Sequence, residues 1–202
     1  MTKTTLSGTI PSQRLGRSLC LYDTNKIIIH GGVISQQPQH QTFMITIEED
    51  HETQGNDYSG WIVSWWLDLT FFCEEVEAVQ HYRYKHTAVI YDDSMFLSGG
   101  NDANDNPTEE IWRLDLSKLF LRRWALIFFV ENFIWKQCVS PEENPSNFYS
   151  IFFNIDGTSL ALKGRLLFST TSFGQYLYIF GGSTSGWDRT YFNDLWVLDL
   201  RT

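Results

Sequence analysis

The sequence predicts an all-β repeat protein built of similar antiparallel units. A short hydrophobic run that ends in two glycines occurs three times, at residues 26–32, 94–100 and 176–182. Each run is followed by a second run with the pattern Trp-x-Leu-Asp-Leu, which begins at Trp65, Trp112 and Trp196. A supersecondary unit that recurs in this way is the sequence signature of a repeat architecture. The composition agrees, because 16% of the residues are aromatic and aromatic side chains favour strands.

An arginine opens each unit before its first hydrophobic run. From Arg83 to Gly100 there are 17 positions, and from Arg165 to Gly182 there are also 17. In the first unit, Arg14 lies 18 positions before Gly32. The arginine, the double glycine and the tryptophan pattern therefore keep a common register.

These landmarks resemble the kelch repeat, which has an Arg-x-x-His-like opening, a double glycine and an aromatic residue in the third strand. Unit two carries them all: Arg83, His86, Gly99-Gly100 and Trp112. Arg17 and Phe168 stand where units one and three would have histidine. The 47 positions from Trp65 to Trp112 suit the kelch period of about 50 residues.

The resemblance implies a kelch-type β-propeller, or part of one, made of four-stranded antiparallel blades around an axis. A closed ring needs four to eight blades, and only three are recognisable. Three units fit a fragment of a longer propeller, an incomplete gene model, or half of a ring that two chains complete. A homodimer of three-bladed chains would give six blades.

Unit one is expected to span about residues 14–70. Residues 18–22 and 26–30 are its first two strands, and the polar turn at 23–25 joins them. Gly32 and Trp65 lie 33 positions apart, whereas Gly100 and Trp112 lie 12 apart in unit two. The excess predicts a loop insertion at 33–61, with an extra strand at 43–47.

Unit two is expected at about 83–135 and unit three at about 165–202. The irregular interval 119–163 contains neither a double glycine nor the tryptophan pattern. It is a degenerate blade, an outer strand of unit two around Trp135 flanked by long loops, or sequence foreign to the fold. The second interpretation is favoured. Residues 1–13 contain a candidate closing strand at 4–10, for which a frayed terminus is an equal alternative.

Composition excludes several classes of function. A net charge of −9 disfavours nucleic acid and anionic membranes as partners. The apolar run 124–135 is too short and too charged to span a membrane. Three scattered cysteines make neither a disulfide framework nor a zinc site, and no signal peptide is evident, so a cytoplasmic location is expected.

No motif for catalysis, a cofactor or a metal is found. The loop after Gly100 resembles a calcium loop, but Pro107 and Arg113 stand where that pattern needs Gly and Glu. His30 and His86 are expected to be structural. The aspartates of the tryptophan patterns recur once per unit, which favours a role in turns over catalysis: Asp68, Asp115 and Asp199.

The expected function is therefore non-catalytic binding of a protein partner through loops, which differ between units while the strands repeat. The candidate contacts follow the second and third double glycines: Asn101, Asp102, Asn104, Asp105, Ser185, Trp187, Asp188 and Arg189. Trp187 is the most informative, because Trp and Arg are typical anchors of interfaces, although it could equally pack against a neighbouring blade. The alternatives are a kelch-like propeller enzyme of the oxidase or epimerase type, and a fragment without independent function.

Overall fold

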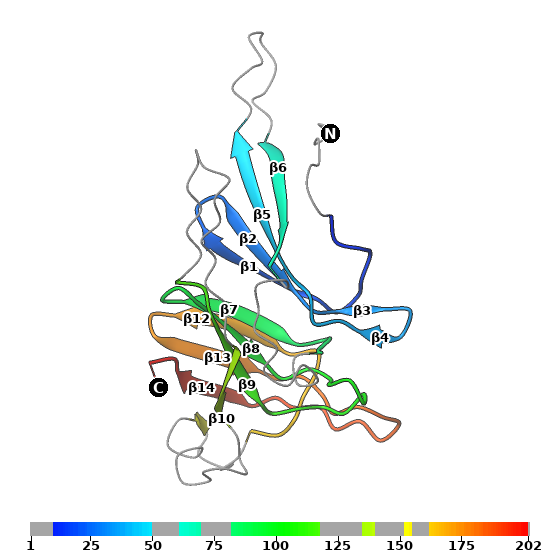
Figure 1. Ribbon diagram of the computed structural model, residues 1–202. Helices are drawn as coiled ribbons and strands as arrows, with labels where there is room; N and C mark the ends of the chain where they lie inside the picture. Colours follow the sequence, from blue (N-terminus) through cyan, green and yellow to red (C-terminus); the bar gives the residue numbers. More distant parts are fainter. Residues whose placement is uncertain are drawn as a thin grey trace, which may run out of the picture.

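The computed structural model describes residues 10–49, 61–69, 82–117, 135–139, 152–154 and 162–201 (Figure 1). Every regular element in these residues is a strand, and the strands form three four-stranded antiparallel sheets and one short hairpin. The predicted fold class is confirmed: the chain is all-β and consists of blade-like units, as in part of a propeller.

Blade one has the strand order β1-β2-β5-β6. Its strands are β1 (Ser18–Asp23), β2 (Lys26–His30), β5 (Thr42–Glu49) and β6 (Trp61–Asp68). The hairpin of β3 (Val33–Ile34) and β4 (Gln37–Pro38) lies in the connection from β2 to β5.

Blades two and three have the same architecture. Blade two comprises β7 (Thr87–Tyr91), β8 (Ser94–Ser98), β9 (Ile111–Asp115) and β10 (Trp135–Val139). Blade three comprises β12 (Ser169–Phe173), β13 (Tyr176–Phe180), β14 (Leu195–Asp199) and, outermost, β11 (Phe152–Asn154). The described parts of the interval 119–163 thus supply outer strands to two different sheets. Residues 1–9, which hold most of the candidate closing strand, lie outside the described residues.

The third strand of blade one differs from the sequence expectation. The structure places β5, not the strand with Trp65, beside β2, and Trp65 belongs to the outer strand β6. Phe43 is therefore the counterpart of Trp112, and it follows Gly32 by 11 positions, close to the 12 of blade two. The spacing that predicted an extra strand at 43–47 is thus the ordinary interval to the third strand.

A backbone hydrogen bond confirms this register. Ile47 N–H donates to the carbonyl of Asn25, in the turn between β1 and β2, over 2.8 Å. Leu116 makes the same bond to Asp93 at 2.7 Å, and Leu200 makes it to Gln175 at 2.8 Å. The bond comes directly after the third strand in blades two and three, and within β5 in blade one, which continues to Glu49.

The recurring aspartates hold turns, as expected, in blades two and three. Asp115 Oδ1 accepts from Ser117 N–H over 2.9 Å, and Asp199 Oδ1 accepts from Arg201 N–H over 3.1 Å. A carboxylate that bonds the backbone two residues onward is a common way to fix a turn. In blade one Thr46 occupies this register, because Asp68 belongs to the outer strand.

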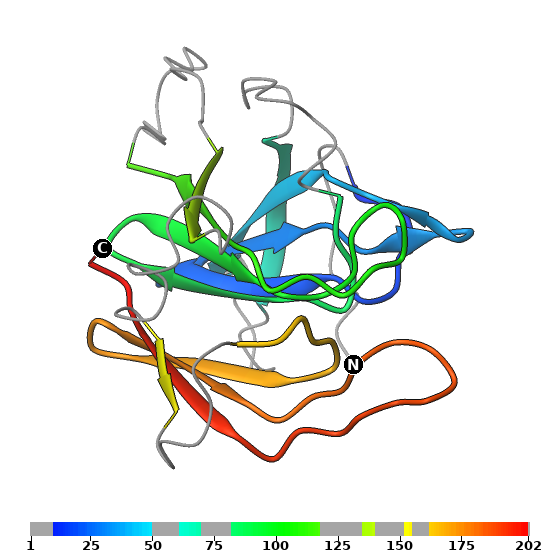
Figure 2. The ribbon, with the colours of Figure 1, turned by 90° about the horizontal axis from the view of Figure 1, so that it is seen from below.

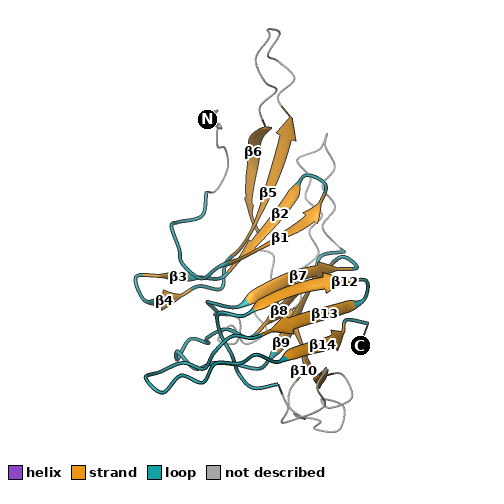
Figure 3. Cartoon of the chain, turned by 180° about the vertical axis from the view of Figure 1, so that it is seen from behind, coloured by secondary structure: helices purple, strands orange, loops and turns teal. Residues whose placement is uncertain are grey.

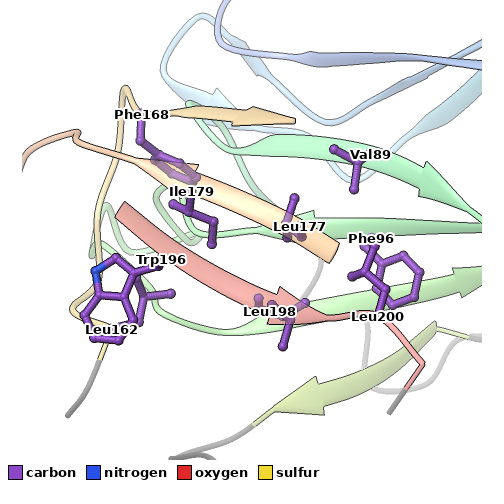
Figure 4. Close-up of a cluster of buried hydrophobic side chains, with 10 residues drawn as sticks. Val89, Phe96, Leu162, Phe168, Leu177, Ile179, Trp196, Leu198 and Leu200 are labelled. Carbon is purple, nitrogen blue, oxygen red and sulfur yellow. The ribbon is translucent and has the colours of Figure 1, made fainter. Parts of the chain in front are cut away.

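The blades pack face to face through two hydrophobic cores. In the core between blades two and three, Val89 and Phe96 of blade two meet Leu177, Ile179 and Trp196 of blade three (Figure 4). The core between blades one and two is formed by Ile28, Met44, Leu69, Met95, Leu97, Trp112, Leu114 and Leu116. The first strands β1, β7 and β12 lie next to one another (Figure 3). Burial of such apolar side chains is the dominant force that joins the blades.

The double glycines form a joint between consecutive blades. Gly32 N–H donates to the carbonyl of Arg83 over 2.8 Å, and Gly100 N–H donates to the carbonyl of Arg165 over 2.9 Å. The second glycine of one blade is thus bonded to the opening arginine of the next.

One side chain fills each joint. His86 lies between Gly31 of blade one and Gly100 of its own blade, and a Cβ at either glycine would come within 2.8 Å of it. Phe168 lies in the same way against Gly99 and Gly182. All four glycines have positive φ, so both the space and the backbone conformation require glycine.

Candidate partner-binding site

A buried arginine anchors the base of each loop that follows a double glycine. The loops are loop one (residues 33–41), loop two (101–110) and loop three (183–194). Arg14, Arg83 and Arg165 donate from Nη1 to the carbonyl of the first glycine, Gly31, Gly99 and Gly181, at 3.2, 3.2 and 2.9 Å. All three arginines are buried, so the landmark that opens each unit in the sequence supports a loop from below.

An acceptor at the end of each loop completes the anchor. Arg165 makes a two-pronged ion pair with Asp194, with distances of 2.6 and 3.0 Å, and Trp196 Nε1 donates to the same carboxylate over 2.6 Å. Burial raises the pKa of Asp194, but the hydrogen bonds from Arg165 and Trp196 outweigh it, and the pKa is lowered overall. The carboxylate therefore stays ionised, and the loop is fixed at both ends.

Loop two has the same anchor and a compact interior. Arg83 pairs with Glu110, which also accepts from Trp112 Nε1 over 3.1 Å. Within the loop, Asp102 Oδ1 accepts from the backbone N–H groups of Asn104 and Asn106 at 2.8 and 2.9 Å.

Asn101 has a structural role in loop two. Its side chain is buried, and its Nδ2 donates to the hydroxyl of Tyr84 over 3.0 Å and to Asp105 Oδ1. Tyr84 also bonds Asp105. Burial, and then the hydrogen bond to Asp105, raise the pKa of Tyr84. Of the predicted contacts in this loop, Asn104 and Asp105 are exposed and Asp102 is half-buried, whereas Asn101 is placed to hold the loop.

Loop three presents the most exposed aromatic group. Thr184 and Thr190 close its neck, with Thr184 N–H to the Thr190 carbonyl and Thr190 N–H to Thr184 Oγ1, both at 3.0 Å. Trp187 lies beyond this neck and is 104% exposed, so it does not pack against a neighbouring blade. Asp188 and Arg189 beside it are exposed, and Ser185 is half-buried.

Sequence reasoning missed three contributors to this surface. Tyr191 of loop three is largely exposed, and loop one forms the hairpin of β3 and β4, with positive φ at Ser35 and Gln36. His40 of loop one lies 4.4 Å from Tyr82, between ring centroids. The spacing from Gly32 to Phe43 was the signal that could have identified loop one.

The three loops extend to the same side of the molecule (Figures 1 and 2). Loop two contributes four carboxylates and no basic residue, whereas loop three carries Asp188, Arg189 and Asp194. The loops that carry the predicted residues thus lie on one side of the molecule, and they differ in charge.

The histidines of the first two blades take part in packing. His30 Nδ1 lies 2.8 Å from Thr42 Oγ1, and His86 Nε2 lies 2.9 Å from Ser18 Oγ of blade one. Burial, helped by the charge of Arg83, lowers the pKa of His86 to about 3. His86 is therefore neutral at physiological pH, and Cys20 is too, since burial raises the pKa of its thiol to about 12.

Among the residues that the structure describes, no group of three or more His, Cys, Asp or Glu side chains could hold a metal ion. A search of the same residues for a helix long and apolar enough to cross a membrane found none.

Repeated four-stranded antiparallel blades, joined at double glycines and carrying variable loops on one side, define a class of repeat β proteins. The family model described as Kelch motif matches residues 164–202, from the opening arginine of blade three through its third strand. The chain therefore carries a kelch motif, and the resemblance to the kelch-repeat family is confirmed.

One similar solved structure is titled "Structure of YjhT". It is 13% identical with a TM-score of 0.44, and the match covers 86% of this chain and 36% of that chain. The present chain thus spans about a third of that protein's length. No curated protein matches the sequence.

Proposed function

We propose that this chain is a non-catalytic protein-interaction module that binds a partner through loops two and three. The observation that carries the proposal is Trp187, a fully exposed indole at the tip of a loop whose neck and base are hydrogen-bonded. A tryptophan side chain has only two rotatable bonds, so it loses little conformational freedom on binding, and it buries a large apolar area, which makes it a typical interface anchor.

The charge of the loops indicates what kind of partner they fit. Loop two carries Asp102, Asp105, Glu109 and Glu110 without a basic residue. A basic surface on the partner would complement the negative charge of this loop. A neutral or basic protein surface with a pocket for an indole is therefore the partner we propose.

A cytoplasmic location is part of the proposal. Cys20 is a free thiol in the first strand of blade one, which suits a reducing compartment. Imaging of a fluorescent fusion checks this location, and a secretory or organellar pattern would contradict it.

Partner binding is tested with a Trp187→Ala/Asp188→Ala variant. The binding partner is first captured by crosslinking in cells and identified, and its affinity for purified chain is then measured by calorimetry. Loss of a central tryptophan anchor should raise Kd by about 30-fold, which corresponds to roughly 2 kcal/mol.

The matched control is Arg201→Ala, which removes an exposed side chain that follows the third strand of blade three, outside the loops. It should leave partner affinity unchanged. Equal affinity of the loop variant and the native chain would contradict the proposed site.

A further inference from the structure

Blade three has a free face at the position where blades one and two each receive the next blade. In blade one, Tyr22 lies on this face and its hydroxyl donates to Asp93 Oδ1 and to the carbonyl of Leu116, both at 3.3 Å. Phe173 follows the opening arginine Arg165 by eight positions, as Tyr22 follows Arg14, yet it is 77% exposed. Phe180 on the same sheet is also exposed.

The double glycine of blade three lacks, among the described residues, the contact that the other two double glycines make with the opening arginine of the next blade. Gly32 and Gly100 donate their N–H to the opening arginine of the next blade, whereas Gly182 N–H has no acceptor among the described residues. The space above Gly181 is open too, because a Cβ there would meet only the carbonyl of Phe192, at 3.2 Å. The equivalent space at Gly31 or Gly99 holds a ring of the next blade.

Blade one shows the other half of such a joint. Ser18 on β1 faces blade two, where it bonds His86, so the alternate residues Leu19 and Leu21 point to the opposite face. Leu19 is 58% exposed and Leu21 is 65% exposed. Their counterparts in blade two, Ala88 and Ile90, pack against the core shared with blade one.

The opening segment of blade one has the groups that form the joint in blades two and three. The carbonyl of Arg14, which corresponds to the acceptor carbonyls of Arg83 and Arg165, accepts from the guanidinium of Arg17 over 2.6 Å. Arg17 itself has the position of His86 and Phe168, the side chains that fill the joints, and it is exposed.

We infer that the free face of blade three binds blade one of a second copy of this chain, head to tail. Gly182 N–H then replaces Arg17 as the donor to the Arg14 carbonyl, and Arg17 moves over Gly181. Leu19 and Leu21 cover Phe173 and the neighbouring aromatic face. The contact continues the joint that the chain already makes twice between its own blades.

A second copy is the occupant because, among the described residues, the exposed face of blade three and the exposed face of blade one offer the two complementary halves of the joint that the chain already makes between its own blades. Two chains joined at both ends form a closed ring of six blades, within the range of known propellers. Head-to-tail contacts give a ring when the rotation closes and a filament when it does not. This inference is independent of the partner-binding loops, which lie outside the joint.

The test is the solution mass of the native chain and of two charge variants, Leu21→Lys and Phe173→Asp. Size exclusion with light scattering should give twice the 23.6-kDa chain mass for the native protein at micromolar concentration. Each variant alone should give the single mass, because a charge lies in both joints of its ring. Both residues are exposed in the chain, so circular dichroism should show an unchanged fold.

Mixing the two variants tests the direction of the contact. In a mixed pair, one joint brings Asp at 173 to Lys at 21 and the other is native, so the double mass should return. Trp187→Ala is the control with an exposed aromatic residue outside the joint, and it should keep the double mass.

Three outcomes would overturn the inference. If the native chain has the single mass at every concentration, the chain does not bind a second copy, and the face of blade three is left for a blade of another protein. A dimer that Phe173→Asp breaks and Leu21→Lys does not is a symmetric contact between two copies of blade three. A ladder of masses shows filaments in place of a closed ring.

Discussion

Blade one and blade three hold their buried opening arginine with loop-end acceptors of different charge. In blade three, Arg165 is paired with the carboxylate of Asp194, which also accepts from Trp196. The guanidinium is buried, and it lies 4.4 Å from the ring centroid of Phe192. A charged pair in this setting depends on both partners, because either one left alone would be a poorly solvated charge.

Blade one keeps the arginine and replaces the carboxylate with an amide. Arg14 Nη2 donates to Gln41 Oε1 over 2.9 Å, and its guanidinium lies 5.1 Å from the ring centroid of Phe43. Arg14 also donates to Ser12, from Nε to the carbonyl and from Nη2 to the hydroxyl, both at 3.2 Å. The hydrogen bond to the first glycine is common to all three blades, whereas the loop-end acceptor is a carboxylate in blades two and three and an amide in blade one. The shared requirement is therefore a donor that holds the glycine carbonyl, and the carboxylate is an addition.

The largest effect should come from removing the arginine of blade three. Arg165→Ala removes the arginine that donates to the Gly181 carbonyl and that neutralises the Asp194 carboxylate, which keeps only the hydrogen bond from Trp196 as a side-chain donor among the described contacts. We expect a loss of about 3–5 kcal/mol in the free energy of unfolding. Urea denaturation at fixed protomer concentration measures it. Arg201→Ala removes an exposed arginine that pairs with Asp199, and we expect no measurable change in the free energy of unfolding. Similar losses in the two variants would contradict the role given to burial.

A smaller, pH-dependent effect distinguishes the two filled joints. His86 fills the joint of blades one and two, and Phe168 fills that of blades two and three. Burial lowers the pKa of folded His86 to about 3, whereas unfolded histidine titrates near 6.5. Between these values only the unfolded chain takes up the proton, so stability falls as pH drops below about 6.5.

His86→Phe should therefore reduce the loss of stability between pH 7.5 and pH 5 by about 2 kcal/mol. Denaturant unfolding at the two pH values measures this difference. Ser18→Ala is the matched control, because it removes the hydrogen bond to His86 and keeps the imidazole. An acid sensitivity that persists in His86→Phe would rule out this histidine as its source.

The smallest effect should follow from giving blade one the charge of blade three. Gln41→Glu places a carboxylate beside Arg14, and we expect a gain of about 0.5–1 kcal/mol, because the new pair is partly exposed to solvent. The gain should shrink in high salt and disappear near pH 4 as the carboxyl protonates. A destabilised variant would mean that blade one excludes the charge.

The sequence was most informative where blades share a backbone requirement. The double glycines and opening arginines were visible because glycine alone fits the joint and the arginine recurs beneath every loop. The third strand of blade one was misassigned because it has Phe43 where the other third strands have tryptophan. The outer strand around Trp65 happens to match the tryptophan pattern.

Other features left no such mark in the sequence. The short outer strand β11 pairs with the edge of β14 through backbone hydrogen bonds, which do not require a particular sequence motif. In the loops, an exposed polar residue and a buried one look alike in sequence. Asn101 was therefore included among the contacts although it is buried against Tyr84, whereas Trp187 was identified because its size makes exposure unusual.

The place of β11 also determines how blade three responds to force. Because β11 comes from chain that precedes β12, the strand β14 lies inside its sheet, with hydrogen bonds to β13 on one side and β11 on the other. Removal of β14 from its sheet must break two hydrogen-bonded ladders, whereas β6 and β10, at the outer edges of their sheets, each pair with a single neighbour. Blade three is thereby locked against mechanical unravelling from that strand.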